Sequence, residues 1–334
     1  MTAAASNAWL GQTHVGDCRD LLRQMADDGV QVQMCVTSPP YFRLRSYLPA
    51  DHPDKALELG TEPAPAAFIA NLVEVFREVH RILADDGTLW IVIGDTYAAR
   101  RTWQAASTKG GPKHAMAQAA VGEMRIGDGL KPKDMIGIPW LLAFALREDG
   151  WFLRQDIIWS KPNPMPESVT DRCTRSHEHL FLLSKSRRYY FDREAISEPS
   201  LDPRGPGNIH PVRQPPGESA SGPNGNLRGR LHQVGARKTR NRRDVWTISN
   251  RPFHGAHFAV FPDELVMPCV LAGSRVGDVV LDPFMGAGTT AAAAERLGRR
   301  FIGCELNGSF LDLHRQRRQP AGRSPVNNST EKQS

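Results

Sequence analysis

The sequence predicts an α/β protein built on a doubly wound, mostly parallel β-sheet, with an irregular basic region attached to it. Short apolar runs of strand length alternate with stretches of helical periodicity along the 334 residues. Turns that contain glycine separate several of these stretches, and two loops rich in Pro or Gly directly follow apolar strands. Strands that alternate with helices are typical of a parallel, doubly wound sheet.

The first cycle of strands and helices lies between residues 32 and 93. Val32–Val36 is an apolar strand, and it ends at two prolines that stop regular structure. Apolar residues at helical spacing predict a helix over Phe68–Leu83. A turn at Asp85–Gly87 and an apolar strand at Leu89–Ile93 are expected to follow.

The remaining chain repeats the pattern. The expected elements are a helix at Trp140–Leu146, a turn at Glu148–Gly150, strands at Phe152–Trp159, Leu180–Leu183 and Val279–Leu281, a helix at Thr289–Leu297 and a strand at Arg300–Cys304. Two stretches interrupt this alternation: residues 99–134 are polar and weakly periodic, and residues 202–230 contain 12 Gly and Pro in 29 positions. We expect an insertion at the first and no regular element at the second, and a disordered tail over residues 319–334.

Composition limits the class of protein. The chain has no apolar run of about 18 residues, which excludes a membrane span. Its first residues lack the charged and apolar parts of a secretory signal. The five cysteines are scattered and form no C-x-x-C pair, which argues against a disulfide framework and a zinc site. A reduced, cytoplasmic protein is therefore expected.

The net charge of +6 is unevenly distributed. Residues 201–245 hold nine Lys and Arg against three Asp and Glu, and eight of the nine are arginine. Residues 99–134 and 315–334 each carry a net charge of +4, which leaves −8 on the rest of the chain. Positive charge therefore gathers where the fold pattern fails, as expected of a protein that grips a polyanion.

A glycine-rich loop follows the strand at Val279–Leu281 and opens the next helix. Gly286 and Gly288 allow the backbone to approach a ligand closely, and the helix N-terminus offers free N–H donors. The following strand ends at Glu305, where a carboxylate can accept hydrogen bonds from ribose hydroxyls. An isolated G-x-G would be a structural turn, but this combination predicts a nucleoside site.

The second motif is Thr37-Ser38-Pro39-Pro40-Tyr41, directly after the first strand. Taken alone, it could equally be a surface turn. Together with Phe284-Met285-Gly286-Ala287-Gly288, it resembles the amino-methylating, S-adenosylmethionine-dependent DNA methyltransferases of the circularly permuted β group. In that group a [DNS]-P-P-[YFW] motif comes first, a target-recognition region follows, and an F-x-G-x-G loop comes last. Gly16-Asp17 and the segment His257–Pro262 match further parts of the family pattern, and Gly94-Asp95 matches it more weakly.

The resemblance implies a permuted Rossmann-like methyltransferase fold that binds S-adenosyl-L-methionine and double-stranded DNA. It divides the chain into a catalytic half (1–197), a target-recognition region (198–250) and a cofactor-binding half (251–318). The implied catalytic residues are Ser38, Pro39, Pro40 and Tyr41, and the implied cofactor residues are Asp17, Thr37, Asp282, Phe284, Gly286, Gly288, Thr289 and Glu305. No metal is expected. A restriction–modification system would add a cognate restriction endonuclease as partner; the sequence decides neither that nor the oligomeric state.

These residue types suit methyl transfer to an amine. The exocyclic amine of a base is a poor nucleophile, because its lone pair is delocalised into the ring. Ser38 Oγ and the Pro39 carbonyl can accept hydrogen bonds from that amine, and the two prolines fix their direction. Tyr41 offers a face on which a flipped-out base can stack, which recovers about 1–3 kcal/mol of the flipping cost.

The acceptor base is interpreted as cytosine, at N4. In the resembled family, Ser at the first motif position is associated mainly with cytosine N4, and Asp or Asn with adenine N6. Adenine N6 stays the alternative. Methylation at cytosine C5 needs a cysteine nucleophile; Cys269 follows a proline within an apolar helical run, and Cys35 lies inside a strand, so both are expected in the core. A non-catalytic DNA-binding protein and an RNA methyltransferase are the rivals from other classes.

Residues 201–245 lie where the family places target recognition, with a disordered linker as the alternative. Arginine suits bidentate contacts to guanine and phosphate. The DNA-binding residues expected there are Arg228, Arg230, Arg237, Lys238, Arg240, Arg242 and Arg243.

A few other residues are candidates for the site. The triplet His177–His179 lacks a third ligand at useful spacing, which disfavours a metal site. The family places an aromatic residue of the base pocket near Tyr190. Arg43 and Arg45 could equally grip a phosphate or lie on a solvated loop.

Overall fold

The computed structural model describes residues 8–98, 130–200, 238–250 and 261–318. The chain forms two compact units, of which the larger combines residues 1–191 with 244–334 and the smaller is residues 192–243. Residues 244–250, the end of the expected target-recognition region 198–250, lie in the larger unit. Most of the expected insertion (99–129), the tail, and residues 257–260 of the segment before the glycine-rich loop lie outside the described residues.

An eight-stranded sheet organises the larger unit. In spatial order its strands are β1 (Gln12–Val15), β10 (Arg300–Glu305), β9 (Val279–Asp282), β2 (Val32–Thr37), β3 (Leu83–Ile93), β5 (His177–Ser184), β4 (Phe152–Ser160) and β8 (Val245–Thr247). Only β5 is antiparallel to its neighbours β3 and β4, and every other pair in this sheet is parallel. The predicted mixed α/β fold with a mostly parallel sheet is confirmed.

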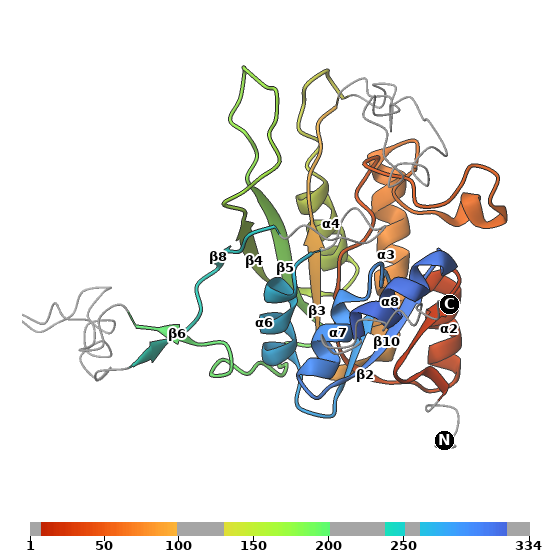
Figure 1. Cartoon of the computed structure of the whole chain (residues 1–334), viewed down its shortest axis with the longest axis vertical. Coiled ribbons are helices and arrows are strands. Elements are labelled where there is room, and N and C mark those ends of the chain that lie inside the picture. Colours follow the sequence, from red (N-terminus) through yellow and green to blue (C-terminus); the bar gives the residue numbers. More distant parts are fainter. Residues whose placement is uncertain (1–7, 99–129, 201–237, 251–260, 319–334) are drawn as a thin grey trace, which may run out of the picture. The chain divides into compact units, whose positions relative to one another are not determined.

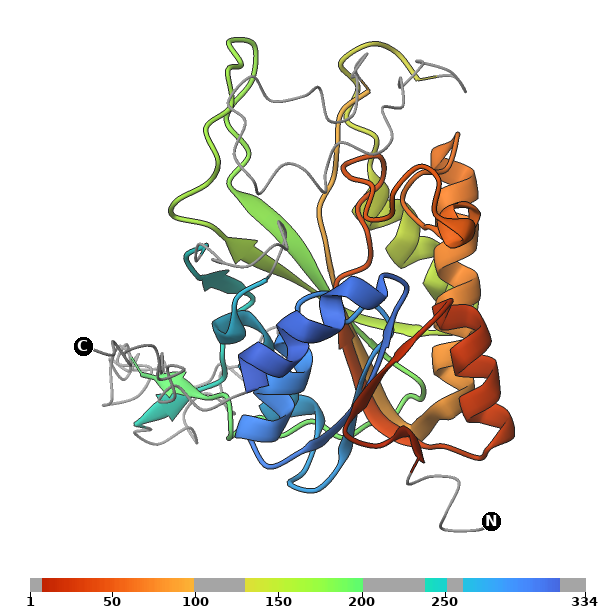
Figure 2. The same ribbon diagram turned by 45° about the vertical axis from the view of Figure 1, so that its right-hand side comes forward.

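Helices cover the sheet in two groups (Figures 1 and 2). In one group α2 (Cys18–Asp27) packs on α3 (Pro65–Ile82), which packs on α4 (Ile138–Glu148). In the other, α6 (Asp263–Gly273) contacts α7 (Thr289–Arg296), which contacts α8 (Leu311–Arg318). Short 3₁₀ helices lie at η1 (Pro53–Leu57) and η3 (Gly308–Phe310). Among the described helices, none is long and apolar enough to span a bilayer.

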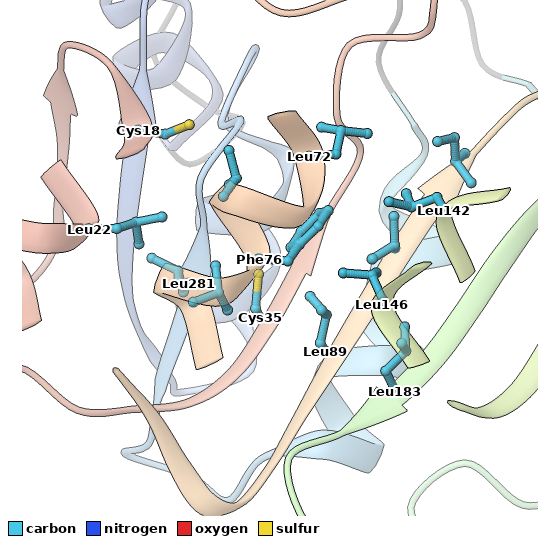
Figure 3. Packing of buried hydrophobic residues seen from close by; sticks show 14 of the residues in the cluster. Cys18, Leu22, Cys35, Leu72, Phe76, Leu89, Leu142, Leu146, Leu183 and Leu281 are labelled. Atoms are coloured by element: carbon cyan, nitrogen blue, oxygen red, sulfur yellow. The ribbon is translucent and has the colours of Figure 1, made fainter. Parts of the chain in front are cut away.

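The core between the sheet and α2–α4 follows the two-residue period of the strands. Cys35 and Leu89 face this core, and Figure 3 shows them beside Phe76 of α3. Met34, which precedes Cys35 in β2, points to the opposite face of the sheet, where it approaches Gly273 of α6. Burying each large apolar side chain stabilises the fold by about 1.5–3 kcal/mol. Cys35 and Cys269 are both buried free thiols, as the apolar sequence around them predicted.

The prediction of a turn at Asp85–Gly87 is wrong. The structure instead continues β3 from Leu83 to Ile93 with an irregularity at this point: Val32 pairs with Leu83, but Met34 pairs with Thr88. The extra residues of β3 form a bulge that Lys185 holds from outside, since its backbone N–H donates to the Gly87 carbonyl and its Nζ to the Leu83 carbonyl. Leu83 is buried and paired with Val32 on one side of the bulge, and Thr88 is paired with Met34 on the other.

The smaller unit contains a two-stranded antiparallel ribbon, β6 (Glu198–Pro199) with β7 (Thr239–Arg240). The carboxylate of Glu198 bridges two arginines across and beyond this ribbon. Its Oε1 accepts from Arg240 Nε at 2.8 Å and from Arg243 Nε at 2.9 Å. These ion pairs hold the pKa of Glu198 below its usual range, against the opposing effect of desolvation.

Candidate active site

A cavity of about 890 Å³ lies in the larger unit at the carboxyl ends of the parallel strands. Both motifs singled out from the sequence open into it, because β2 and β9 are neighbours in the sheet and each motif follows its strand. The predicted site residues that line the cavity are Asp17, Ser38, Pro39, Pro40, Tyr41, Phe284, Gly286, Thr289 and Glu305. Segments from opposite ends of the chain therefore build one site.

Thr37 and Asp282 were expected to contact cofactor, but both are fully buried and neither lines the cavity. The Asp282 carboxylate accepts from Thr37 Oγ1 at 2.5 Å and from Thr290 Oγ1 at 2.6 Å. It also accepts from the backbone N–H of Phe284 at 3.0 Å. Its oxygens are engaged inside the protein, so Asp282 ties the end of β2 to the glycine-rich loop. Burial raises the pKa of this carboxyl from 3.8 to about 6, although the three hydrogen bonds oppose that shift.

The glycine-rich loop depends on two glycines with positive φ. Gly286 has φ +54° and Gly288 has φ +80°, a left-handed conformation that costs a residue with a Cβ about 1–2 kcal/mol. A Cβ at Gly288 would lie 3.3 Å from the Cα atom of His314 on α8. Gly288 is therefore absent from the cavity wall and serves close packing instead. The buried ring of His314 bonds the Gly286 carbonyl through Nε2, which fixes the loop from behind.

Glu305, the last residue of β10, faces the same loop. One carboxylate oxygen accepts from the Gly286 N–H at 2.8 Å and the other from the Asn307 N–H at 2.9 Å. The side chain lines the cavity although the residue is only 9% exposed. Burial raises the pKa of this carboxyl from 4.5 to about 7, so its charge state changes close to neutral pH.

Asp17 caps the N-terminus of α2 at the cavity wall. Its Oδ1 accepts from the backbone N–H of Arg19 at 2.8 Å, which satisfies one of the free donors of the helix. The Arg19 guanidinium also forms an ion pair with the same carboxylate. This local turn holds a nearly buried acidic group at the edge of the cavity.

The Ser38-Pro39-Pro40-Tyr41 loop is packed against two glycines. A Cβ on Gly60, which has φ +90°, would lie 3.0 Å from Pro40 Cβ. A Cβ on Gly94, at the end of β3, would lie 2.7 Å from Cε2 of Tyr41, so only glycine allows the aromatic ring to rest on this backbone. Ser38 and Tyr41 are held in fixed positions at the cavity by these contacts.

Two charged residues that the sequence reasoning missed complete this part of the cavity. Glu178 on β5 accepts a 2.5 Å hydrogen bond from the Tyr41 hydroxyl, and Lys161, directly after β4, donates to the same carboxylate. Their positions in the sequence could have indicated them, because Lys161 follows one apolar strand and Glu178 begins the next, and these two strands pair with each other.

Other candidates lie elsewhere. Tyr190 does not line the cavity; its backbone N–H donates to the Asp86 carbonyl at the start of β3, and Arg275 covers its ring at 3.8 Å. Its sequence neighbourhood is aromatic, but the chain has by then reached the opposite end of the sheet. Arg43 bonds the carbonyls of Glu62 and Pro63 and so supports its own loop, whereas Arg45 lines the cavity.

No group of three or more His, Cys, Asp or Glu side chains that could hold a metal ion occurs among the described residues. His179 of the His-Glu-His triplet is buried and bonds Asp156 through Nδ1 at 3.0 Å. Of the expected DNA-binding residues, Arg228, Arg230 and Arg237 lie outside the described residues. Lys238, Arg240, Arg242 and Arg243 lie in the smaller unit.

A comparison with protein families matches residues 32–316 to the family of N6 and N4 methylases described as DNA methylase. The chain belongs to this family. It is thus a DNA methyltransferase, and the matched region contains both motifs that meet at the cavity.

Curated relatives agree with this assignment. The chain is 44% identical to the Type II methyltransferase M.Cfr9I of Citrobacter freundii over 298 residues, which cover 89% of this chain and 84% of the relative. It is 43% identical to the Type II methyltransferase M.SmaI of Serratia marcescens over 304 residues, which cover 91% and 89%.

Solved structures share the fold. A candidate DNA modification methylase from Thermus thermophilus, solved with S-adenosyl-L-methionine, is 26% identical, has a TM-score of 0.53 and covers 92% of each chain. The cytosine-N4-specific PvuII DNA methyltransferase is 16% identical with a TM-score of 0.59, covering 94% of this chain and 88% of its own. This second likeness shows the fold alone.

Proposed function

We propose that this DNA methyltransferase transfers a methyl group from S-adenosyl-L-methionine to the exocyclic N4 amine of a cytosine flipped out of double-stranded DNA. The observation that carries the proposal is the shared cavity: Ser38-Pro39-Pro40-Tyr41 and the Gly286 loop open into the same 890 Å³ space. An acceptor amine and a methyl donor held on these two loops would meet there. Proximity and orientation are the main requirements for this transfer.

The residues around the Gly286 loop fit the cofactor. An adenosyl group needs acceptors for its ribose hydroxyls and an unobstructed backbone; Glu305 offers the acceptors and Gly286 the backbone. Asp17 would contact the adenine, and Phe284 would border the cofactor site. When bound, S-adenosyl-L-methionine supplies a methyl group activated by its sulfonium.

The catalytic loop would act by hydrogen bonding and stacking. Ser38 Oγ and the Pro39 carbonyl would accept the two amine hydrogens, which favours a tetrahedral nitrogen and localises its lone pair. The prolines restrict the direction of both acceptors. The ring of Tyr41, fixed against Gly94, would stack on the target base.

Cytosine is favoured over adenine by Ser38 at the first motif position, where the family uses Asp or Asn mainly for adenine N6. The test is the nucleoside composition of DNA methylated by the purified enzyme. N4-methylcytosine is expected, and N6-methyladenine without N4-methylcytosine would refute the assignment. Sequencing methylated DNA from expressing cells would give the modified base and its surrounding sequence together.

Catalysis and DNA binding should separate in two variants. Ser38→Ala removes one acceptor and Tyr41→Ala removes the stacking face, so both are expected to lose most methyl transfer while DNA affinity changes little. Loss of DNA binding in both would contradict these roles. Their cofactor affinity, measured by calorimetry, is the control for an intact Gly286 loop.

We further propose that the basic segment 201–245 contacts DNA phosphates. The described part of this segment, residues 238–245, is arginine-rich. In the structure Glu198 forms ion pairs with two of its arginines, Arg240 and Arg243. Replacing both arginines by Gln should lower the slope of log affinity against log salt by about one to two. The matched control is Arg77→Gln with Arg81→Gln on α3, which removes the same charge. An unchanged slope in the first variant would remove this segment from the interface.

The Type II names of the relatives support a restriction–modification setting for this chain as well. In such a system, a cognate restriction endonuclease would cut the unmethylated site. Cleavage of unmodified DNA, and protection of DNA methylated by this enzyme, in an extract of cells that carry its gene would test the proposal.

A further inference from the structure

We propose that Met165 enters the DNA duplex and fills the space that the target base leaves when it is flipped out. The inference rests on the proposed function, in which the acceptor base leaves double-stranded DNA and enters the cavity. It does not depend on whether that base is cytosine or adenine, because either base leaves a gap in the stack.

The connection between β4 and β5, residues 161–176, forms part of the cavity wall. It extends beyond the ends of the two strands that it joins (Figure 1). The residues of this connection that line the cavity are Lys161, Asn163, Pro164, Met165, Glu167 and Arg175. A duplex that delivers a base into the cavity therefore passes beside this connection.

Met165 combines a place in the cavity wall with high exposure. The residue is 80% exposed, more than any other large hydrophobic residue that the structure describes. A side chain this exposed contributes little to the core, so it lies at the mouth of the cavity rather than inside it. Pro164 and Pro166 stand on either side of it, and their rings restrict the backbone to a narrow range of conformations.

The chain is anchored on both sides of Met165. Two residues before it, Asn163 donates through Nδ2 to the Asn250 carbonyl and accepts from the Asn250 N–H through Oδ1, both at 2.9 Å. Two residues after it, Glu167 accepts from Arg172 Nη1 at 2.6 Å, and this ion pair closes the connection on itself. The backbone is thus fixed before DNA binds, so little conformational freedom is lost when Met165 contacts a ligand.

Base flipping creates a need for such a side chain. The flipped base leaves its neighbours without a stacking partner, and this lost stacking favours its return. Proteins that distort DNA insert apolar side chains, methionine among them, between base steps to stabilise the distorted form. Methionine is unbranched and adapts to irregular apolar surfaces, which suits it to the faces of the neighbouring bases. An exposed methionine on an anchored loop beside the cavity therefore fits this use.

The test compares Met165→Ala with the wild type in single-turnover methyl transfer, with enzyme in excess over DNA. Two duplexes carry the methylated sequence: in one the target base is paired, and in the other an abasic site replaces its partner. On the paired duplex the variant should be about 10- to 30-fold slower, the factor expected for losing the burial of most of a methionine side chain. On the other duplex no base pair opposes flipping, so the loss should be about threefold or less.

Two further variants serve as controls. Met165→Leu keeps an apolar side chain of similar size and should retain most of the wild-type rate on both duplexes. Val276→Ala should change neither rate, because Val276 is 75% exposed but precedes β9, at the end of the sheet opposite the cavity. A wild-type rate for Met165→Ala on the paired duplex would overturn the proposal. So would an equal loss on both duplexes, or a loss of S-adenosyl-L-methionine affinity that matches the loss of rate.

The outcomes separate this inference from the proposed function. A wild-type enzyme that methylates no base in a paired duplex would refute flipping from double-stranded DNA, and this inference with it. A wild-type enzyme that methylates the paired duplex, with Met165→Ala equally fast, would refute the role of Met165 alone.

Discussion

The affinity for the cofactor is expected to rise with pH because of Glu305. The perturbation is a change from pH 6 to pH 8. Burial raises the pKa of this carboxyl to about 7, so only roughly one-tenth of it is ionised at pH 6 and nine-tenths at pH 8. Ribose hydroxyls donate best to the ionised form, and the affinity should follow the ionised fraction. The expected gain is about tenfold, or about 1.4 kcal/mol.

The assay is calorimetric titration with adenosine and with S-adenosyl-L-methionine. Adenosine carries the ribose but no amino-acid group, so its pH dependence reports the protein rather than the ligand's own α-amino group. Glu305→Gln is the control, since an amide does not titrate, and its adenosine affinity should be flat over this range. Equal pH dependence in the variant and the wild type would refute the reasoning.

The same shift has an opposite consequence for the unliganded protein. A carboxyl whose pKa is raised by folding binds its proton more tightly in the folded state than in the unfolded one. Its contribution to stability is therefore greatest below pH 4.5 and is lost as the pH rises through about 7. Cofactor binding, which favours the ionised form, should offset this loss.

Three substitutions test the framework of the cavity. Gly288→Ala should cost about 1–2 kcal/mol in urea unfolding, because its φ of +80° is left-handed and its Cβ would approach His314; a neutral result would contradict the strain argument. Thr290→Val should cost about 1–3 kcal/mol by removing a partner of buried Asp282, and Thr290→Ser should restore most of it. Asp95→Ala should cost about 1 kcal/mol, since this carboxylate accepts from the first N–H groups of α4, while Asp95→Asn should retain part of the effect.

Sequence reasoning located the loops because their signals are local. At the glycine-rich motif, a strand, two glycines and the start of a helix follow one another within about ten residues. At the other motif, two prolines directly follow the end of a strand. The helix at Phe68–Leu83 was found from its own periodicity, and α3 spans Pro65–Ile82. Local spacing also indicates α2, because Asp17 is an N-cap and Cys18, Leu22 and Met25 recur at helical spacing.

Features that depend on distant partners could not be predicted in this way. Periodicity does not encode strand direction, so nothing in the run Leu180–Leu183 indicates that β5 is antiparallel. Asp282 looked like a ligand because its motif is functional, yet its hydrogen-bond partner Thr37 lies 245 residues away and removes it from the cavity. Glu178 was read within the His177–His179 triplet, whereas its partner is Tyr41, 137 residues earlier.

The bond between Thr37 and Asp282 also bears on how the chain matures on the ribosome. Strand β2 leaves the ribosome long before β9, which it must pair with in the finished sheet. At about 5–20 residues per second, the interval between these two strands is on the order of 12–50 s. Throughout that time one side of β2 offers unpaired backbone groups from an apolar strand, an arrangement prone to pairing with other chains. The arrangement of this active site across the two ends of the chain therefore places a demand on chaperones that a contiguous site would not.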